Sequence, residues 1–139
     1  MIKKQRRGTV ILDTDKGILV AAGRSKVFLL PGGGAKRWES RRRAAVRELR
    51  EETGLRTTST HFLFRHLGKV HRSHGGGHFQ DHHKVFLVKA TGTPEQRHEI
   101  RYVAWYKPGS KIKLSTVTLE IVQKYLHLKT NGNQTIRLH

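Results

Sequence analysis

The chain has 139 residues and 35% hydrophobic content, enough for one domain with its own core and too little for two. It carries 28 Lys and Arg against 10 Asp and Glu, a formal net charge of +18 that favours anionic ligands. Without cysteine it forms neither disulfides nor thiolate zinc sites. The basic segment 1–7 precedes no apolar run of signal-peptide or membrane-spanning length, so we expect a cytoplasmic protein with no membrane partner.

Short runs of β-prone residues predict the strands of a sheet. The candidates are 9–12, 18–22, 27–30, 61–70, 84–90 and 100–106. The first two are joined by residues 13–17, which have the composition of a hairpin turn. The third run ends at Pro31, and the three glycines that follow free the backbone to approach a ligand.

Two helices complete the predicted fold. The first occupies the segment after Ser40, whose side chain can cap it, and ends at Gly54, which suits a left-handed residue. The second begins at Ser115 or Thr116 and has an apolar side for packing on a sheet. The tail 130–139 is polar and expected to be flexible. We predict a single α/β domain over 1–139, an α/β/α sandwich with a mixed β-sheet between helices.

The most informative segment holds four of the ten acidic residues. Gly33 is followed after five residues by Glu39 and after seven more by Arg47-Glu48-Leu49-Arg50-Glu51-Glu52-Thr53-Gly54-Leu55. On a helix, Glu48, Glu51 and Glu52 project from one face, where like charges repel unless a cation lies among them. Carboxylate ligands without Cys or His favour Mg²⁺ or Mn²⁺ over zinc.

The spacing from Gly33 to Leu55 resembles the complete signature of the Nudix hydrolases, and no position departs from it. The resemblance implies a Mg²⁺-dependent hydrolase, with Mn²⁺ as a substitute, that cleaves a phosphoanhydride bond in a nucleoside diphosphate linked to another group. Its substrates would include (d)NTPs, dinucleoside polyphosphates and related polyphosphates. The resemblance also assigns roles to matching residues: metal ligation to Glu48, Glu51, Glu52 and the carbonyl of Gly32, orientation of a glutamate to Arg47, and support to Gly33, Glu39 and Gly54.

The general base has more than one candidate. Glu48 or Glu52 can activate water from within the signature, whereas in some relatives a glutamate of a later loop does so. Glu99 is the candidate of that kind. The alternative is that Glu99 is a surface carboxylate paired with Arg97 or Arg101.

Basic residues surround the acidic segment and favour a polyphosphate substrate or the backbone of RNA. The candidate substrate contacts are Arg24, Lys36, Arg37, Trp38 and His78. For Trp38 two interpretations stay open, stacking on a nucleobase and packing against Arg42.

Seven of the ten histidines lie between residues 61 and 83. Because Gly75, Gly76 and Gly77 lie among them, we expect a flexible loop that closes over the active site and contacts substrate. Adventitious metal binding is the alternative.

Two other functions and one assembly remain open from the sequence. Removal of pyrophosphate from RNA 5′ ends fits the charge equally well. A catalytically weak nucleic-acid-binding module on the same fold is the competing class, but it would not require the full set of glutamates. A homodimer is known among relatives, although no residue marks an interface.

Overall fold

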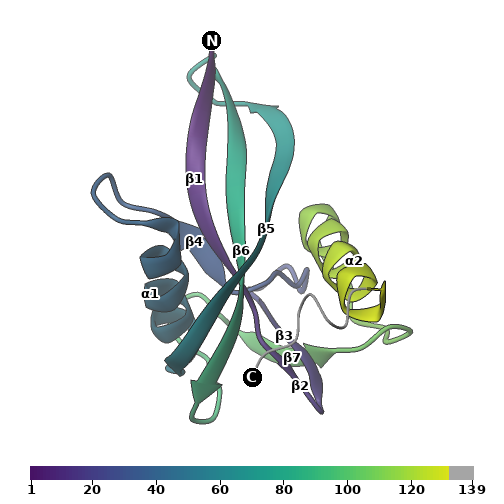
Figure 1. Cartoon of the computed structure of the whole chain (residues 1–139). Helices are drawn as coiled ribbons and strands as arrows, with labels where there is room; N and C mark the ends of the chain where they lie inside the picture. Colours follow the sequence, from purple (N-terminus) through teal and green to yellow (C-terminus); the bar gives the residue numbers. More distant parts are fainter. Residues whose placement is uncertain (132–139) are drawn as a thin grey trace.

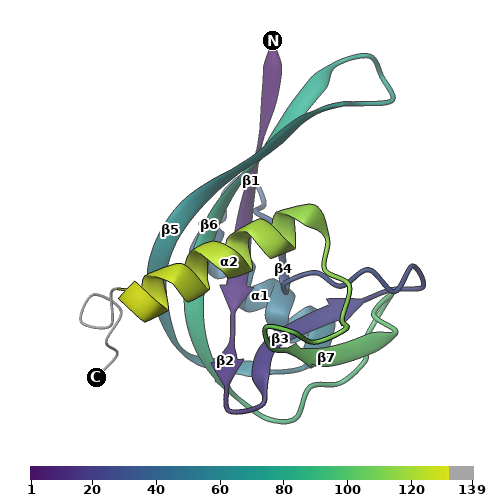
Figure 2. The same cartoon turned by 90° about the vertical axis from the view of Figure 1, so that its right-hand side faces the viewer.

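The computed structural model describes residues 1–131. This part of the chain forms seven strands and two helices (Figures 1 and 2). In chain order they are β1 (Ile2–Ile11), β2 (Asp13–Thr14), β3 (Gly17–Ala22), β4 (Gly32–Gly34), α1 (Arg41–Thr53), β5 (Arg56–Arg72), β6 (His78–Thr91), β7 (Tyr102–Tyr106) and α2 (Thr116–Asn131). Apart from its first two residues, which belong to α2, the predicted tail 130–139 lies outside the described residues.

The strands form two sheets. The larger sheet is mixed and has the order β4-β1-β6-β5, in which β1 is parallel to β6 and antiparallel to β4. A smaller antiparallel sheet has the order β2-β3-β7. Helices α1 and α2 lie on opposite sides of the long strands (Figure 1). The predicted α/β/α sandwich is therefore confirmed, and the division into two sheets was not predicted.

Successive side chains of the central strands point to opposite faces of the sheet, so each helix covers its own apolar core. Val10 and Phe86 pack with Leu49 of α1 in one buried cluster. Their neighbours Ile11 and Leu87 belong to the other cluster, which α2 covers. Both faces of the larger sheet are therefore apolar where helices cover them. None of the helices in residues 1–131 is long and apolar enough to cross a membrane.

Helix α1 begins and ends at the predicted residues. The hydroxyl of Ser40 accepts a hydrogen bond from the backbone N–H of Arg43 at 3.1 Å, which caps the first turn. Gly54 ends the helix with φ 79°, and its N–H donates to the carbonyl of Arg50 at 2.8 Å. Both ends of the helix that carries the glutamates are thus fixed by local chemistry.

Two predicted elements differ from the structure. The run 27–30 forms only isolated bridges, from Leu29 to Ala21 and from Phe28 to Leu114. The glycines at 32–34, which were not among the predicted strands, form strand β4 beside β1. The basic segment 1–7 is also mostly strand, because β1 starts at residue 2 and pairs with β6 throughout.

Within residues 61–83, the strand predicted at 61–70 is confirmed as part of β5, whereas the loop expected to close over the active site is wrong. Most of this segment belongs to strands β5 and β6, which pair as a hairpin with a turn at residues 73–77. At the tip, His78 pairs with Arg72 across the hairpin and with Ile2 of β1. The three strands extend beyond both helices (Figures 1 and 2). The histidines of this segment therefore lie on the paired strands and their connecting turn, and they do not form a lid.

Candidate active site

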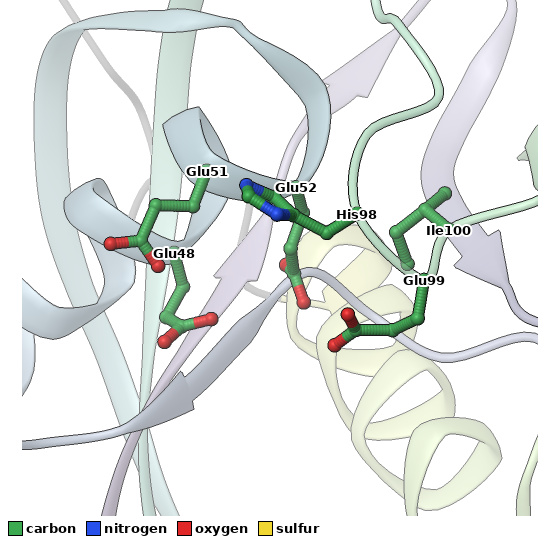
Figure 3. Close-up of a pocket in the computed structure, with 6 residues that line it drawn as sticks. All are labelled: Glu48, Glu51, Glu52, His98, Glu99 and Ile100. Carbon is green, nitrogen blue, oxygen red and sulfur yellow. The ribbon is translucent and has the colours of Figure 1, made fainter.

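Carboxylates from two distant segments line one cavity of about 470 Å³ (Figure 3). Its lining residues are Glu48, Glu51, Glu52, His98, Glu99 and Ile100. Helix α1 supplies the first three, and the segment that leads into β7 supplies the others. In Figure 3 the carboxylates of Glu48, Glu52 and Glu99 point into the same space.

Glu99 is exposed, and neither arginine of the alternative interpretation pairs with it. Its neighbour Arg97 forms an ion pair with Glu95 at 3.0 Å instead. Within residues 1–131 no ion pair involves Glu99, and the backbone of Arg101 donates its N–H to the carbonyl of Ala22. The loop therefore leaves the Glu99 carboxylate in the cavity.

Arg47 organises the carboxylates through its guanidinium group. Its Nε and Nη2 donate to the two carboxylate oxygens of Glu39 at 2.8 and 2.9 Å. Its Nη1 donates to Glu48 at 2.8 Å and contacts Glu51 at 3.2 Å, while Nη2 also reaches the carbonyl of Gly34 at 3.1 Å. This planar fork fixes three carboxylates and the end of β4 relative to one another.

Glu39 is the anchor of this arrangement. The hydrogen bonds from Arg47 lower the pKa of Glu39 to about 2, against the opposing effect of desolvation. The backbone N–H of Lys36 adds a bond at 3.1 Å, and Arg6 donates to the main-chain carbonyl of Glu39 at 3.0 Å. Glu39 is thus ionised and fully engaged in holding Arg47 and the loop before α1.

Glu52 has the opposite electrostatic environment. Burial, together with the charges of Glu48 and Glu99, raises the pKa of Glu52 to about 7, although the N–H of Gly32 donates to its Oε1 at 3.1 Å. The carboxylates therefore repel one another inside the cavity. A cation bound there would relieve this repulsion and favour the ionised form of Glu52.

The donor set fits a hard divalent cation. Carboxylate oxygens line the cavity, and strand β4, where Gly32 has φ 138° and Gly33 lies against Glu48, passes beside it. In the described part of the chain no three His, Asp or Glu side chains already converge on one point. Arg47 holds an oxygen of Glu48 and both oxygens of Glu51, so metal binding requires these two side chains to rotate.

The candidate substrate contacts fall into two groups. Lys36, Arg37 and Trp38 are exposed in the loop between β4 and α1. Trp38 is 84% exposed, so the interpretation that it packs against Arg42 is wrong. Arg24 lies in the turn after β3.

The Arg24 turn adjoins the carboxylate cavity, whereas His78 does not. A β-carbon on Gly23, the residue before this turn, would be 3.3 Å from the carbonyl oxygen of Glu99. His78 instead lines a separate cavity with Met1, Lys3 and Gln5 at the hairpin tip. Sequence reasoning did not anticipate His98, which lines the carboxylate cavity with φ 54°. No motif in the sequence marks that position.

The fold and the carboxylate cavity together define a hydrolase of the kind that acts on acid anhydrides. A family model described as the NUDIX domain matches residues 3–120. The chain belongs to the Nudix family, and it is a pyrophosphohydrolase of the Nudix type.

Solved structures agree with this assignment. A Nudix hydrolase family member from Chromobacterium violaceum has 36% sequence identity and a TM-score of 0.77, over 94% of this chain and 81% of that chain. The E. coli ORF135 protein has 25% identity and a TM-score of 0.75, over 94% of each chain. An ADP-ribose pyrophosphatase from Streptococcus suis has 15% identity and a TM-score of 0.63 over 92% of each chain, a likeness of fold alone.

Proposed function

We propose that this protein uses Mg²⁺, with Mn²⁺ as a substitute, to hydrolyse a phosphoanhydride bond in a nucleoside diphosphate linked to another group. The observation that carries the proposal is the cavity that three glutamates of α1 and Glu99 line together. Such a site is suited to a substrate whose negative charge must be neutralised before water can attack it. The net charge of +18 favours the approach of such a substrate.

Glu48, Glu51 and Glu52, with the carbonyl of Gly32, would hold the metal. When bound, the metal would supply neutralisation of phosphate oxygens and polarisation of phosphorus. Before the metal binds, Arg47 holds Glu48 and Glu51, and both side chains would rotate away from its guanidinium to reach the metal. The N–H of Gly32 holds Glu52 by a hydrogen bond.

Among the candidate bases, Glu99 is the one that no ion pair or hydrogen bond holds in place within the described residues. Arg47 holds Glu48, and Gly32 holds Glu52, whereas the Glu99 carboxylate has no ion pair within residues 1–131. It would take a proton from water as the water oxygen bonds to phosphorus and the bond to the departing phosphate breaks. Glu48 and Glu52 remain the alternatives within the signature.

Substrate orientation would come from the loop between β4 and α1 and from the turn that contains Arg24. Lys36 and Arg37 would contact phosphates, and Arg24 would approach from the Glu99 side. The exposed indole of Trp38 offers a stacking surface for a base.

The test is a comparison of Glu51→Gln, Glu52→Gln and wild type on a substrate panel with Mg²⁺ or Mn²⁺. The panel contains nucleoside triphosphates, oxidised nucleotides, dinucleoside polyphosphates, ADP-ribose and 5′-triphosphorylated RNA. We expect metal-dependent turnover of one class, which both substitutions abolish. The matched control is Glu95→Gln, an exposed carboxylate outside the cavity, which should retain full activity. A wild type that hydrolyses none of these substrates would contradict the proposal.

A second candidate is the removal of pyrophosphate from RNA 5′ ends. The observation in its favour is a groove of about 730 Å³ that reaches Gly34 at the end of β4. Its lining includes five cationic residues, which are Lys3, Lys4, Arg6, Arg7 and Arg37. Preference for triphosphorylated RNA over the free nucleotides in the same panel would select this function. Tight RNA binding by a wild type without turnover would instead favour the binding module.

A further inference from the structure

The larger sheet extends beyond α1 (Figure 1), and cationic side chains gather on the side of the sheet that α1 covers. On β5 and β6, Arg65 is opposite Lys84, so both side chains project from the same side of the sheet. Lys84 is followed two residues later by Phe86, which belongs to the core cluster under α1, so this side is the α1 side. We define the basic sheet face as Arg6, Arg41, Arg42, Phe62, Arg65 and Lys84.

These cations lack nearby counter-charges. Within the described residues, none of Arg41, Arg42, Arg65 and Lys84 forms an ion pair. Burial lowers the pKa of Lys84, and the charges of Arg41 and Arg65 lower it further. Burial and then Arg6 and Arg65 lower the pKa of Arg41. A surface that repels itself in this way gains free energy when a polyanion covers it.

An aromatic ring lies among the cations. Phe62 is 41% exposed, and the Nζ of Lys84 lies 5.9 Å from its ring centroid. Arg42 covers the neighbouring ring of Phe86 at 4.9 Å, and the two rings meet edge to face at 5.8 Å. A cavity of about 200 Å³ opens between these groups and the start of α1. Its lining residues are Ser40, Arg41, Arg42, Phe62, Lys84 and Phe86.

We infer that the basic sheet face binds single-stranded nucleic acid, with phosphates against Arg41, Arg65 and Lys84 and a base against Phe62. An exposed ring among cations on a sheet is the combination that holds unpaired bases and their backbone together. An inorganic polyphosphate would use the cations and leave the ring exposed. A duplex would keep its bases stacked away from Phe62.

This inference goes beyond the proposed hydrolysis because the basic sheet face is separate from the carboxylate cavity. The cavity beside Phe62 has no lining residue in common with the carboxylate cavity. The first lies at the start of α1, whereas Glu48, Glu51 and Glu52 lie in the second half of that helix. Binding can therefore be measured without any reaction.

The first experiment measures fluorescence anisotropy of short 5′-hydroxyl RNA and DNA oligonucleotides in EDTA over a range of salt concentrations. The test variant is Arg65→Gln/Lys84→Gln. The control is Lys16→Gln/Lys111→Gln, which removes the same charge from exposed positions in other loops. We expect weaker binding by the test variant alone. Its slope of log K against log salt should be shallower by about 1.4, since each lost single-strand phosphate contact removes about 0.7. Equal losses in both variants would overturn the inference.

The second experiment separates bases from phosphate. Phe62→Leu keeps an apolar side chain but removes the ring, so oligonucleotide affinity should fall by about fivefold to 150-fold, the range expected for one stacked base. The inhibition constant of tripolyphosphate, measured by its competition with the oligonucleotide, should be the same for Phe62→Leu and wild type. If duplex or tripolyphosphate binds as tightly as the single strand, or if Phe62→Leu binds normally, the inference is wrong. A difference in affinity between the RNA and DNA oligonucleotides identifies which type of nucleic acid the face prefers.

Hydrolysis of small nucleotides provides the independent readout. Arg65→Gln/Lys84→Gln should hydrolyse them like wild type, and Glu51→Gln should bind the oligonucleotide like wild type. If small nucleotides are hydrolysed normally and Arg65→Gln/Lys84→Gln binds the oligonucleotide as tightly as wild type, binding does not need this face, and only the inference fails. Absence of turnover with intact, face-dependent binding would remove only the proposed function.

Discussion

Gly33 of β4 lies so close to Glu48 of α1 that a β-carbon at residue 33 would be 2.6 Å from the carboxyl carbon of Glu48 and 2.8 Å from its Cγ. Glycine at this position therefore reserves the space that the Glu48 side chain occupies. The neighbouring Gly34 differs, because a β-carbon there would have no heavy atom within 4 Å. The two adjacent glycines provide a matched pair of substitutions.

We predict that Gly33→Ala lowers metal-dependent hydrolysis on the order of a hundredfold, because displacement of a catalytic group by about 1 Å has a cost of that size. The melting temperature should change little, since the side chain of Glu48 can rotate away. Steady-state kinetics and thermal unfolding measure the two effects. Gly34→Ala should be normal in both assays. Full activity in Gly33→Ala would show that the position of Glu48 is not critical.

Arg47→Lys tests the guanidinium fork. Lysine keeps the positive charge but cannot bond both oxygens of Glu39 and still reach Glu48 and Glu51. We expect the affinity for Mn²⁺, measured by calorimetry, and the hydrolytic rate to fall about tenfold to a hundredfold, as for other residues that orient metal ligands. Arg43→Lys, an exposed substitution on the same helix, should match wild type. An Arg47→Lys protein with wild-type Mn²⁺ affinity would contradict this role.

The helix that carries the glutamates was predictable because residues within and next to it determine where it begins and ends. Ser40 caps it, Gly54 ends it, and the spacing of Glu48, Glu51 and Glu52 places them on one side regardless of the rest of the fold. The family signature supplied their expected chemistry. The meeting of Glu99 with these residues depends on tertiary structure and was only a candidate in the sequence.

The hairpin of β5 and β6 was not predictable in its full length for a physical reason. Its outer residues lie beyond both helices, so no buried face imposes an alternation of polar and apolar residues there. Its stability comes from pairing with distant β1, as between Ile2 and His78. Strand β4 was missed similarly, because glycines 32–34 have low β-propensity and form a strand through pairing with residues 7–9.

Glu99→Gln tests the assignment of the base. If Glu99 activates water, kcat should fall about a hundredfold to ten-thousandfold, the usual contribution of a general base. The affinity for Mn²⁺ should remain unchanged, because ligation is assigned to Glu48, Glu51 and Glu52. Glu52→Gln should weaken Mn²⁺ binding instead. If Glu99→Gln loses as much Mn²⁺ affinity as Glu52→Gln, Glu99 is a metal ligand, and the base is Glu48 or Glu52.

The buried imidazole of His83 should make the stability of the fold depend on pH. It is buried in β6, and its Nδ1 shares a hydrogen bond of 2.8 Å with the hydroxyl of Thr9. Its Nε2 is buried without a partner among the described atoms. Burial, followed by the charge of Arg7, lowers the pKa of His83 from 6.5 to about 4. The folded state therefore keeps this imidazole neutral, while the unfolded chain protonates it more readily.

Acid should destabilise the folded protein, because the unfolded chain binds a proton on His83 that the folded state does not. His83 should not affect the pH dependence of stability above pH 6.5, and stability should be lost as pH falls from 6.5 towards 4. The loss amounts to roughly 3 kcal/mol at the acid end. Urea unfolding across this range measures it, and His83→Gln, which cannot titrate, should flatten this part of the profile. His74→Gln, in the exposed hairpin turn, should retain the wild-type slope. Parallel profiles for wild type and His83→Gln would mean that other groups cause the acid sensitivity.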